Sequence, residues 1–353
     1  MIWKGLIHKY KEQLPVSEKT PEISLFEGNT PMIPISNLAK AYQIPADWYI
    51  KFEGMNPTGS FKDRGMCMAI AKAKEEGAKA VICASTGNTS ASAAAYAARA
   101  NMACFVIIPE GKIALGKLSQ AMLHGAKVIQ IKGNFDKALE FVQQICEKYP
   151  IALVNSINPY RIEGQKTIAF EIIEALGDAP TYHSIPVGNA GNITATWKGY
   201  NEAMASGLSD HLPKMLGFQA AGAAPIVLGK VVEKPETIAT AIRIGNPVSW
   251  KQAEAARDLS GGVIDKIDDE TITHFQKELA RLDGVFCEPA CAVALAGVVA
   301  YHQKQPFQKG DSIVSTITGH GLKDPERAIE IAEKPLFAED SLKEIAAIIT
   351  AYL

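Results

Sequence analysis

The stretch Ala80-Val81-Ile82-Cys83-Ala84-Ser85-Thr86-Gly87-Asn88-Thr89-Ser90 decides the fold class of this sequence. Its first five residues form an apolar run without polar alternation, which is typical of a strand buried on both faces of a parallel sheet. A loop of small polar residues follows, and the alanine-rich pattern of residues 90–100 predicts a helix. A strand that passes through a short loop into a helix is the repeating unit of α/β proteins.

The same alternation continues along most of the chain. Further strands are predicted at 104–108, 127–131, 151–154, 183–187, 215–220 and 312–317, and the first three are also expected to be buried on both faces. Helices are predicted at 116–124, 135–149, 164–176, 193–205 and 290–301. This order predicts a doubly wound α/β fold with parallel sheets. A length of 353 residues suggests two domains, and because no Pro/Gly/Ser-rich linker divides the chain, we expect them to be interleaved.

Composition and charge exclude several classes of function. The chain is 47% hydrophobic and 21% charged, with a net charge of −2, so it lacks the basic footprint expected of a nucleic-acid-binding protein. Its longest apolar stretch, 290–301, is shorter than the ~20 residues of a membrane span, and the N-terminus lacks the apolar segment of a signal peptide. Six cysteines without a CxxC pair favour a reducing cytoplasm.

Three predicted strands end in loops of unusual composition, at residues 85–90, 188–192 and 318–321. In open parallel sheets, ligands bind at the carboxyl ends of strands. Small residues let a ligand approach the backbone, and the N–H groups at a helix start attract anions. The first loop is therefore a candidate for a carboxylate or a ring oxygen, and the second for a phosphate. Each loop alone is also compatible with an ordinary turn in which Asn or Ser caps a helix.

A fourth segment, Asn56-Pro57-Thr58-Gly59-Ser60-Phe61-Lys62-Asp63-Arg64-Gly65, carries the most reactive candidate. Pro57 and Gly59 predict a turn, and the spacing of Ser60 and Asp63 predicts a capping box. Lys62 would then lie in the first helical turn, where the helix dipole and partial burial disfavour an ammonium group. A lysine at an arbitrary position is usually a solvated surface charge. Here the surrounding turn residues favour a nucleophile or a base.

Other known motifs fail on spacing. Residues 111–118 approach a P-loop, but Leu118 stands where Ser or Thr must hold magnesium, and Ser119 comes one position too late. Lys112 and Lys117 remain candidates for contact with a second anionic group. No HExxH, GxSxG or zinc-type Cys/His spacing occurs, so no metal site is predicted.

The four candidate segments together resemble a known family. Residues 57–65, 85–89, 188–192 and 318–325 resemble the pyridoxal-phosphate enzymes of the tryptophan synthase β-subunit fold (fold type II). Within this fold, the combination with residues 155–166 is similar to the threonine synthases, and the likeness extends from about residue 20 to 330.

This resemblance implies an architecture and a cofactor. It implies a large α/β domain made of residues 1–55 and 156–353, a smaller inserted α/β domain at 56–155, and pyridoxal 5'-phosphate (PLP) in the cleft between them. It also implies a homodimer. Lys62 would be the Schiff-base lysine, Asn88 would bind the ring hydroxyl and Thr318 would face the pyridine nitrogen. The cofactor phosphate would be held by Gly188, Asn189, Ala190, Gly191 and Asn192.

The resemblance also implies a reaction. A carbon–oxygen lyase of this family converts O-phospho-L-homoserine and water to L-threonine and phosphate by β,γ-elimination and replacement, with Lys62 as the proton shuttle. The candidates for the substrate carboxylate are Ser85, Thr86 and Thr89, and those for its phosphate are Lys117, Asn155, Ser156 and Arg161. The alternatives are a threonine or serine dehydratase of the same fold, which needs no second phosphate site, and a non-catalytic phospholigand-binding regulator.

Overall fold

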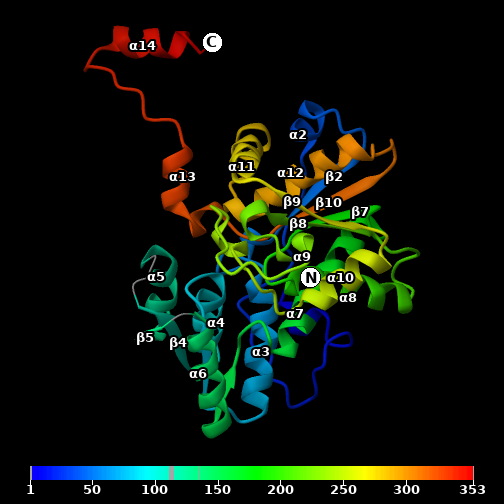
Figure 1. Cartoon of the computed structure of the whole chain (residues 1–353), viewed down its shortest axis with the longest axis vertical. Coiled ribbons are helices and arrows are strands. Elements are labelled where there is room, and N and C mark those ends of the chain that lie inside the picture. The colour runs from blue at the N-terminus through cyan, green and yellow to red at the C-terminus, as the bar shows by residue number, and fades with distance from the viewer. Residues whose placement is uncertain (1, 111–114, 134, 353) are drawn as a thin grey trace.

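Two β-sheets organise the chain (Figure 1). The structure is a computed structural model that describes residues 2–110, 115–133 and 135–352. The larger sheet has the order β1-β2-β10-β7-β8-β9, with β1 (Met32–Pro34), β2 (Asp47–Phe52), β10 (Ser312–Ile317), β7 (Tyr182–Pro186), β8 (Lys214–Ala220) and β9 (Val263–Ile267). The smaller sheet has the order β5-β4-β3-β6, with β5 (Lys127–Ile131), β4 (Ala103–Pro109), β3 (Ala80–Ala84) and β6 (Ile151–Leu153).

The smaller sheet agrees closely with the prediction, except at its edges. All of its strand pairs are parallel, and β3 is buried along its whole length. The expectation that β5 is buried on both faces is wrong, because β5 forms the edge of the sheet and Ile129 is 45% exposed. The other edge strand, β6, is half-buried.

The larger sheet contains three strands that the sequence analysis did not predict: β1, β2 and β9. β1 is only three residues long, ends in a proline and pairs antiparallel with β2, so the sheet is not parallel throughout. A short edge strand is where proline is tolerated. In β2, the charged residue Lys51 interrupts the apolar pattern, although its side chain is buried.

Helices cover both sheets (Figure 1). Around the larger sheet lie α2 (Ser36–Ala41), α7 (Pro159–Leu176), α8 (Gly191–Ala205), α9 (Pro225–Leu228), α10 (Trp250–Leu259), α11 (Asp269–Asp283) and α12 (Pro289–Lys304). The smaller sheet is accompanied by α4 (Asn88–Arg99), α5 (Leu115–Leu123) and α6 (Phe135–Lys148), and α3 (Lys62–Glu75) packs between α4 and α7. The short elements are α1 (Leu6–Lys9) and the 3₁₀ turns η1 (Glu53–Met55), η2 (Ala221–Ala223), η3 (Thr240–Ile242) and η4 (Gly321–Lys323).

The C-terminal segment leaves the body of the protein (Figure 1). It contains α13 (Pro325–Ile331) and α14 (Leu342–Thr350), neither of which buries a residue. Within the described ranges, no helix has the length and apolar character needed to cross a membrane.

Strand register brings the candidate loops to one edge of the larger sheet. Ile317 of β10 lies beside Phe52 of β2, and β7 pairs with the other side of β10. Because these strands are parallel, their carboxyl ends point the same way, and the loops that follow them meet at this edge.

Candidate active site

The lysine segment and the loop after β10 are joined by backbone hydrogen bonds. The Phe61 amide donates to the Thr318 carbonyl at 3.0 Å, and the His320 amide donates to the Gly59 carbonyl at 2.9 Å. Ser60 and Gly319 lie opposite each other in an antiparallel bridge. Lys62 and Thr318, which are 256 positions apart in the chain, are thereby held beside the same short ladder.

The predicted capping box at the start of α3 is wrong. Asp63 accepts hydrogen bonds from the Thr58 amide (2.7 Å), the Thr58 hydroxyl (2.6 Å) and the Ser92 hydroxyl (2.6 Å). The chain turns back at Gly59, where φ is 83°. The Asp63 carboxylate therefore accepts the Thr58 amide and not the Ser60 amide, which a capping box would require. Asp63 therefore ties the turn before Lys62 to α4. Burial raises the pKa of Asp63 to about 6.

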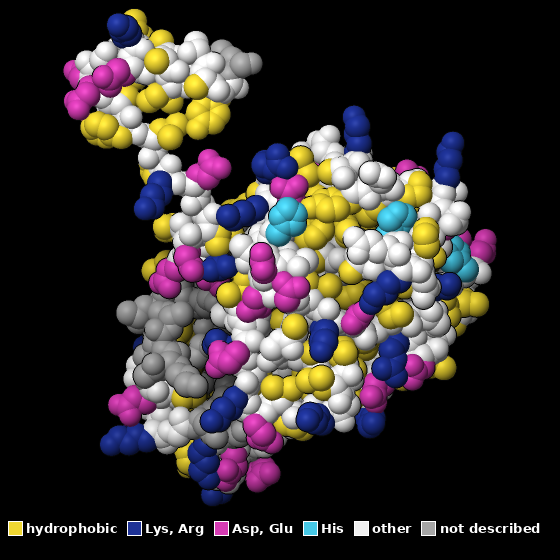
Figure 2. Space-filling model, turned by 45° about the horizontal axis from the view of Figure 1, so that its top comes forward, with side chains coloured by type: hydrophobic (Ala, Val, Ile, Leu, Met, Phe, Trp, Pro, Cys, Tyr) yellow, Lys and Arg dark blue, Asp and Glu magenta, His cyan; other side chains and the backbone are white. Residues whose placement is uncertain are grey.

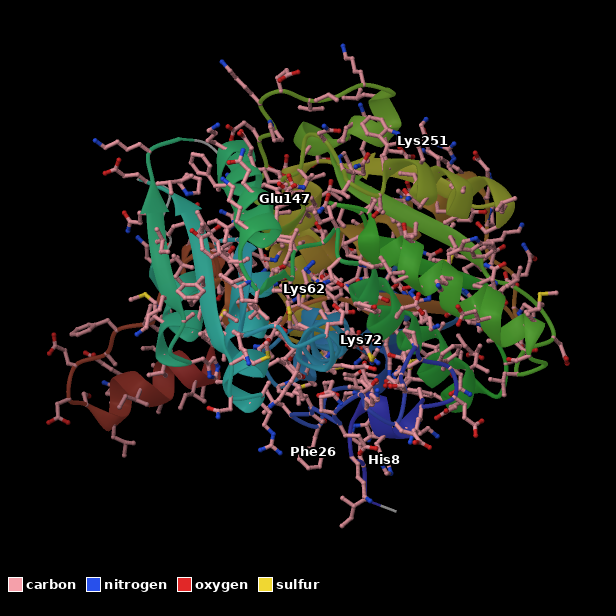
Figure 3. All side chains as sticks on the ribbon, turned by 90° about the horizontal axis from the view of Figure 1, so that it is seen from below. His8, Phe26, Lys62, Lys72, Glu147 and Lys251 are labelled. Carbon is pink, nitrogen blue, oxygen red and sulfur yellow. The ribbon has the colours of Figure 1, made fainter. Side chains whose placement is uncertain are left out.

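Lys62 begins α3, in the first helical turn as predicted (Figure 3). Burial and the nearby Arg161 guanidinium lower its pKa to about 7, against an opposing effect of the Glu288 carboxylate. Its Nζ lies 4.2 Å from the centroid of the Phe61 ring. Near neutral pH, a large fraction of this amine is therefore unprotonated, which is the form that attacks a carbonyl carbon.

Glu288 is the functional residue that the sequence analysis missed. The Asn88 Nδ2 donates to both of its carboxylate oxygens, at 3.3 and 3.2 Å, and the Glu288 amide donates to the Gly319 carbonyl at 3.2 Å. Glu288 immediately precedes Pro289, the first residue of α12. An acidic residue before a proline that opens an apolar helix was the available sequence signal. Glu288 thus joins Asn88 to the loop that carries Thr318.

Cys291 supports the same loop from the core. Its Sγ accepts the Gly319 amide at 3.2 Å and lies 3.4 Å from the Thr318 hydroxyl, which is itself buried. All six cysteines are free.

The loop at 188–192 forms a cradle at the start of α8. Ala190 has a φ of 64°, a left-handed conformation that non-glycine residues rarely adopt, and it directly precedes α8. The Asn189 side chain fixes the loop by accepting the Val248 amide at 2.7 Å and donating to the Ser156 hydroxyl at 2.5 Å. The Asn192 Nδ2 is buried and has no hydrogen-bond partner in the described structure. An unpaired buried donor at a helix N-terminus fits a bound oxyanion.

Arg161, in the first turn of α7, is a second candidate for anion binding. Its side chain is 1% exposed, its Nη1 donates to the Val154 carbonyl at 3.3 Å, and its Nε has no partner among the described residues. Burial lowers its pKa to about 10. A buried guanidinium without a carboxylate is costly unless an anion binds it.

The remaining predicted substrate residues differ in their surroundings. Ser85 and Thr86 are half-buried in the loop before α4, and Thr89 is half-buried in the first turn of that helix. The Asn155 side chain pairs with both the amide and the carbonyl of Ala84, each at 2.9 Å, and so links the ends of β3 and β6. Position 117 lies in α5, but the side chain of Lys117 and residues 111–114 of the near P-loop lie outside the described part of the structure.

A buried charge network holds α3 in place. The guanidinium of Arg64 bonds Glu53 at 2.6 and 2.7 Å and Glu171 at 2.7 Å twice, and Lys51 bonds Glu171 at 2.8 Å. Each of the four side chains is at most 5% exposed. The network connects η1, α3, α7 and β2, so it fixes the helix on which Lys62 stands.

Comparisons with known proteins agree with this site. The chain matches the family "Pyridoxal-phosphate dependent enzyme" over residues 23–319, and it therefore belongs to this family. It is 59% identical to the threonine synthase of Halalkalibacterium halodurans over 93% of this chain and 92% of the relative, and 58% identical to that of a Bacillus species over 93% and 92%. Within the family, the chain is thus a member of the threonine synthases. The structure of maize serine racemase, at 20% identity, has the same fold, with a TM-score of 0.75 over 93% of this chain and 97% of that one.

The predicted fold class and the resemblance are confirmed by these matches, as are the cofactor, PLP, and the class of enzyme, a lyase. The donor set of the site fits this cofactor: a partly neutral Lys62, a cradle with the unpaired Asn192 amide, and the hydroxyl of Thr318 at the opposite loop.

Proposed function

We propose that this chain converts O-phospho-L-homoserine and water to L-threonine and phosphate. The observation that favours this reaction over the dehydratase alternative is Arg161, a buried cation next to Lys62 with no carboxylate partner in the described structure. A substrate with its own phosphate needs such a group in addition to the cradle for the cofactor phosphate. A dehydratase needs only the cradle.

Different residues of the chain would bind different parts of the cofactor. Gly188, Asn189, Ala190, Gly191 and Asn192 would hold its phosphate, Asn88 its ring hydroxyl and Thr318 its pyridine nitrogen. The bound cofactor supplies an electron sink for carbanions formed next to its imine carbon. A threonine hydroxyl at the ring nitrogen would leave that nitrogen unprotonated and moderate the sink.

Lys62 would hold the cofactor and then move protons. Its pKa of about 7 lets the Nζ accept a proton from a substrate carbon and return it at neutral pH without a large penalty in either direction. Glu288 keeps Asn88 in a fixed orientation through the two hydrogen bonds to its amide. The ring would therefore be held against rotation while the protons move.

The substrate would be bound through its two anionic ends. Ser85, Thr86 and Thr89 surround the start of α4 and would bind the carboxylate, because the N–H groups of a helix start favour anions. Arg161, Ser156, Asn155 and Lys117 would bind the phosphate. Of these, Arg161 has the strongest support, since a guanidinium can grip two phosphate oxygens at once.

The first test is incubation of the PLP-loaded protein with O-phospho-L-homoserine while threonine and inorganic phosphate are both followed. Equal release of the two products supports the proposal. Formation of 2-oxobutanoate from added threonine, without turnover of the phosphorylated substrate, would show a dehydratase. Arg161→Met should raise the KM for the phosphorylated substrate by at least 10-fold. An unchanged KM would remove Arg161 from the phosphate site.

We also propose that the chain divides at residues 55/56 and 155/156 into a large domain and a smaller inserted one. All four strands of the smaller sheet fall between these two points, and all six strands of the larger sheet fall outside them. Hydrogen exchange of the holoenzyme tests this division, since amides of residues 56–155 should exchange as a unit separate from the rest of the chain if the boundaries are right.

We propose further that the protein acts in the cytoplasm as a homodimer. The C-terminal arm, residues 332–352, exposes Leu336 by 64%, Phe337 by 81%, Leu342 by 84% and Tyr352 by 73% (Figure 2, upper left). Together with Ile345 and Ile349 these side chains amount to roughly 800 Å², which is the area that each partner of a stable complex covers. A second copy of the chain, exchanging arms, covers two such surfaces. Light scattering should give a dimer that dissociates when the chain is truncated after residue 331. A dimer of unchanged stability would show that the arm is not the contact.

A further inference from the structure

One lysine joins the loop after β10 to both the turn before Lys62 and the helix α5. The Nζ of Lys323, at the end of η4, donates to the Thr58 carbonyl at 3.0 Å and to the Gln120 Oε1 at 2.6 Å. Its half-buried stem lies on Gly59, where an added Cβ would be 3.1 Å from the Lys323 Cδ.

The three segments come from different parts of the fold. Lys323 follows β10 of the larger sheet, whereas Gln120 belongs to α5, which connects β4 and β5 of the smaller sheet. Gln120 lies one helical turn after position 117. Thr58 in turn binds Asp63 through both its amide and its hydroxyl. The ammonium group of Lys323 therefore acts on two features of the site at once: the place of α5 and the turn that precedes Lys62.

We propose that Lys323 is a positioning residue that fixes α5 over the active site and thereby sets the affinity for the phosphorylated substrate. This proposal rests on the proposed function, because it assigns α5 to the phosphate end of the substrate. A charged donor held by two oxygens on separate segments restricts both segments, and an ordered α5 lowers the entropy lost when substrate binds.

The variants Lys323→Met and Gln120→Met remove the hydrogen bond from either side while keeping the length of the side chain. In the holoenzyme each should raise the KM for O-phospho-L-homoserine roughly 5- to 20-fold and lower kcat less than 3-fold. The double variant should be no worse than Lys323→Met alone, because Gln120→Met removes only a hydrogen bond that Lys323→Met has already removed. Additive effects, or an effect on kcat alone, would overturn the proposal. Lys309→Met, at an exposed lysine before β10, is the matched control.

Hydrogen exchange supplies a readout that does not depend on turnover. In PLP-loaded Lys323→Met and Gln120→Met, amides of residues 118–123 should exchange at least 5-fold faster than in the parent and in Lys309→Met, while amides of β7 and β8 stay unchanged. Unchanged exchange in α5 refutes the positioning role even if the parent makes threonine. If α5 exchanges faster in the two variants but the parent enzyme makes no threonine, the proposed function fails and the contact is structural.

Discussion

Replacing Arg64 by methionine should be among the most damaging single changes in this protein. The side chain makes two hydrogen bonds to Glu53 and two to Glu171, and it also bonds the hydroxyls of Thr30 and Thr167. Methionine fills most of the space but leaves two buried carboxylates with only Lys51 to balance them. Breaking a buried ion pair by removing one partner costs about 3–5 kcal/mol, a large part of the ~5–15 kcal/mol that stabilises a typical domain.

Urea denaturation of the PLP-free protein, followed by tryptophan fluorescence and far-UV circular dichroism, measures this cost. We expect the midpoint for Arg64→Met to fall by about 1–2 M, because a chain of this size should have a slope near the upper end of the ~1–3 kcal/mol per molar urea range. The triple variant Arg64→Met, Glu53→Gln, Glu171→Gln removes the stranded charges and should recover more than half of the loss. A shift below 0.3 M for the single variant, or no recovery in the triple one, would refute the assignment of Arg64 to stability.

Three further predictions concern the cradle, acid stability and the reactive lysine. Asn192→Ala should weaken cofactor binding about 10-fold in absorbance titrations, since it removes the unpaired donor, whereas Asn201→Ala on the same helix should bind normally. The cations around Glu171 hold its pKa at about 2 despite burial, so its stabilising effect is complete above the usual pKa of 4.5 and is lost as the pH falls toward 2. In Glu171→Gln, the melting temperature should therefore depend less on pH between 4.5 and 2 than in the parent. An unaltered pH dependence in this range would contradict this role. Glu288→Gln should move the pKa of Lys62 in the PLP-free protein below about 7, measured as the pH dependence of its acetylation by mass spectrometry, and a shift upward would contradict the electrostatic role.

The local sequence pattern was sufficient to predict those parts of the candidate site that consist of a strand and the loop after it. β3, β7 and β10 are apolar runs followed by loops of small polar residues, as predicted, and the loops after β7 and β10 meet at one edge of the larger sheet. The same reasoning failed for Asp63. Its spacing from Ser60 fits a local cap, but a tertiary partner, Ser92, and the turn at Gly59 determine its bonds instead.

For residues whose role depends on a distant partner, the local pattern does not identify that partner. Glu288 lies 200 positions from Asn88, and nothing near either residue indicates that they pair. Lys51 is a similar case. The sequence pattern predicts that a charged residue in a strand is exposed, but Lys51 is buried because it pairs with Glu171, 120 positions away. Short-range periodicity reports which face of an element is apolar, whereas the pairing of buried charges is decided by the packing of separate elements.

The distribution of buried charge supports the proposal that this site binds anions. In the network below α3, two cations, Arg64 and Lys51, are matched by two carboxylates, so it is electrically balanced without a ligand. Beside it, the Glu288 carboxylate raises the pKa of Lys62 but does not act on Arg161, and burial lowers the pKa of both cations. A bound phosphate supplies the missing negative charge and reverses part of that shift. If a phosphate binds beside Arg161 as proposed, its binding and the protonation of Lys62 are coupled, and its release would favour the neutral amine.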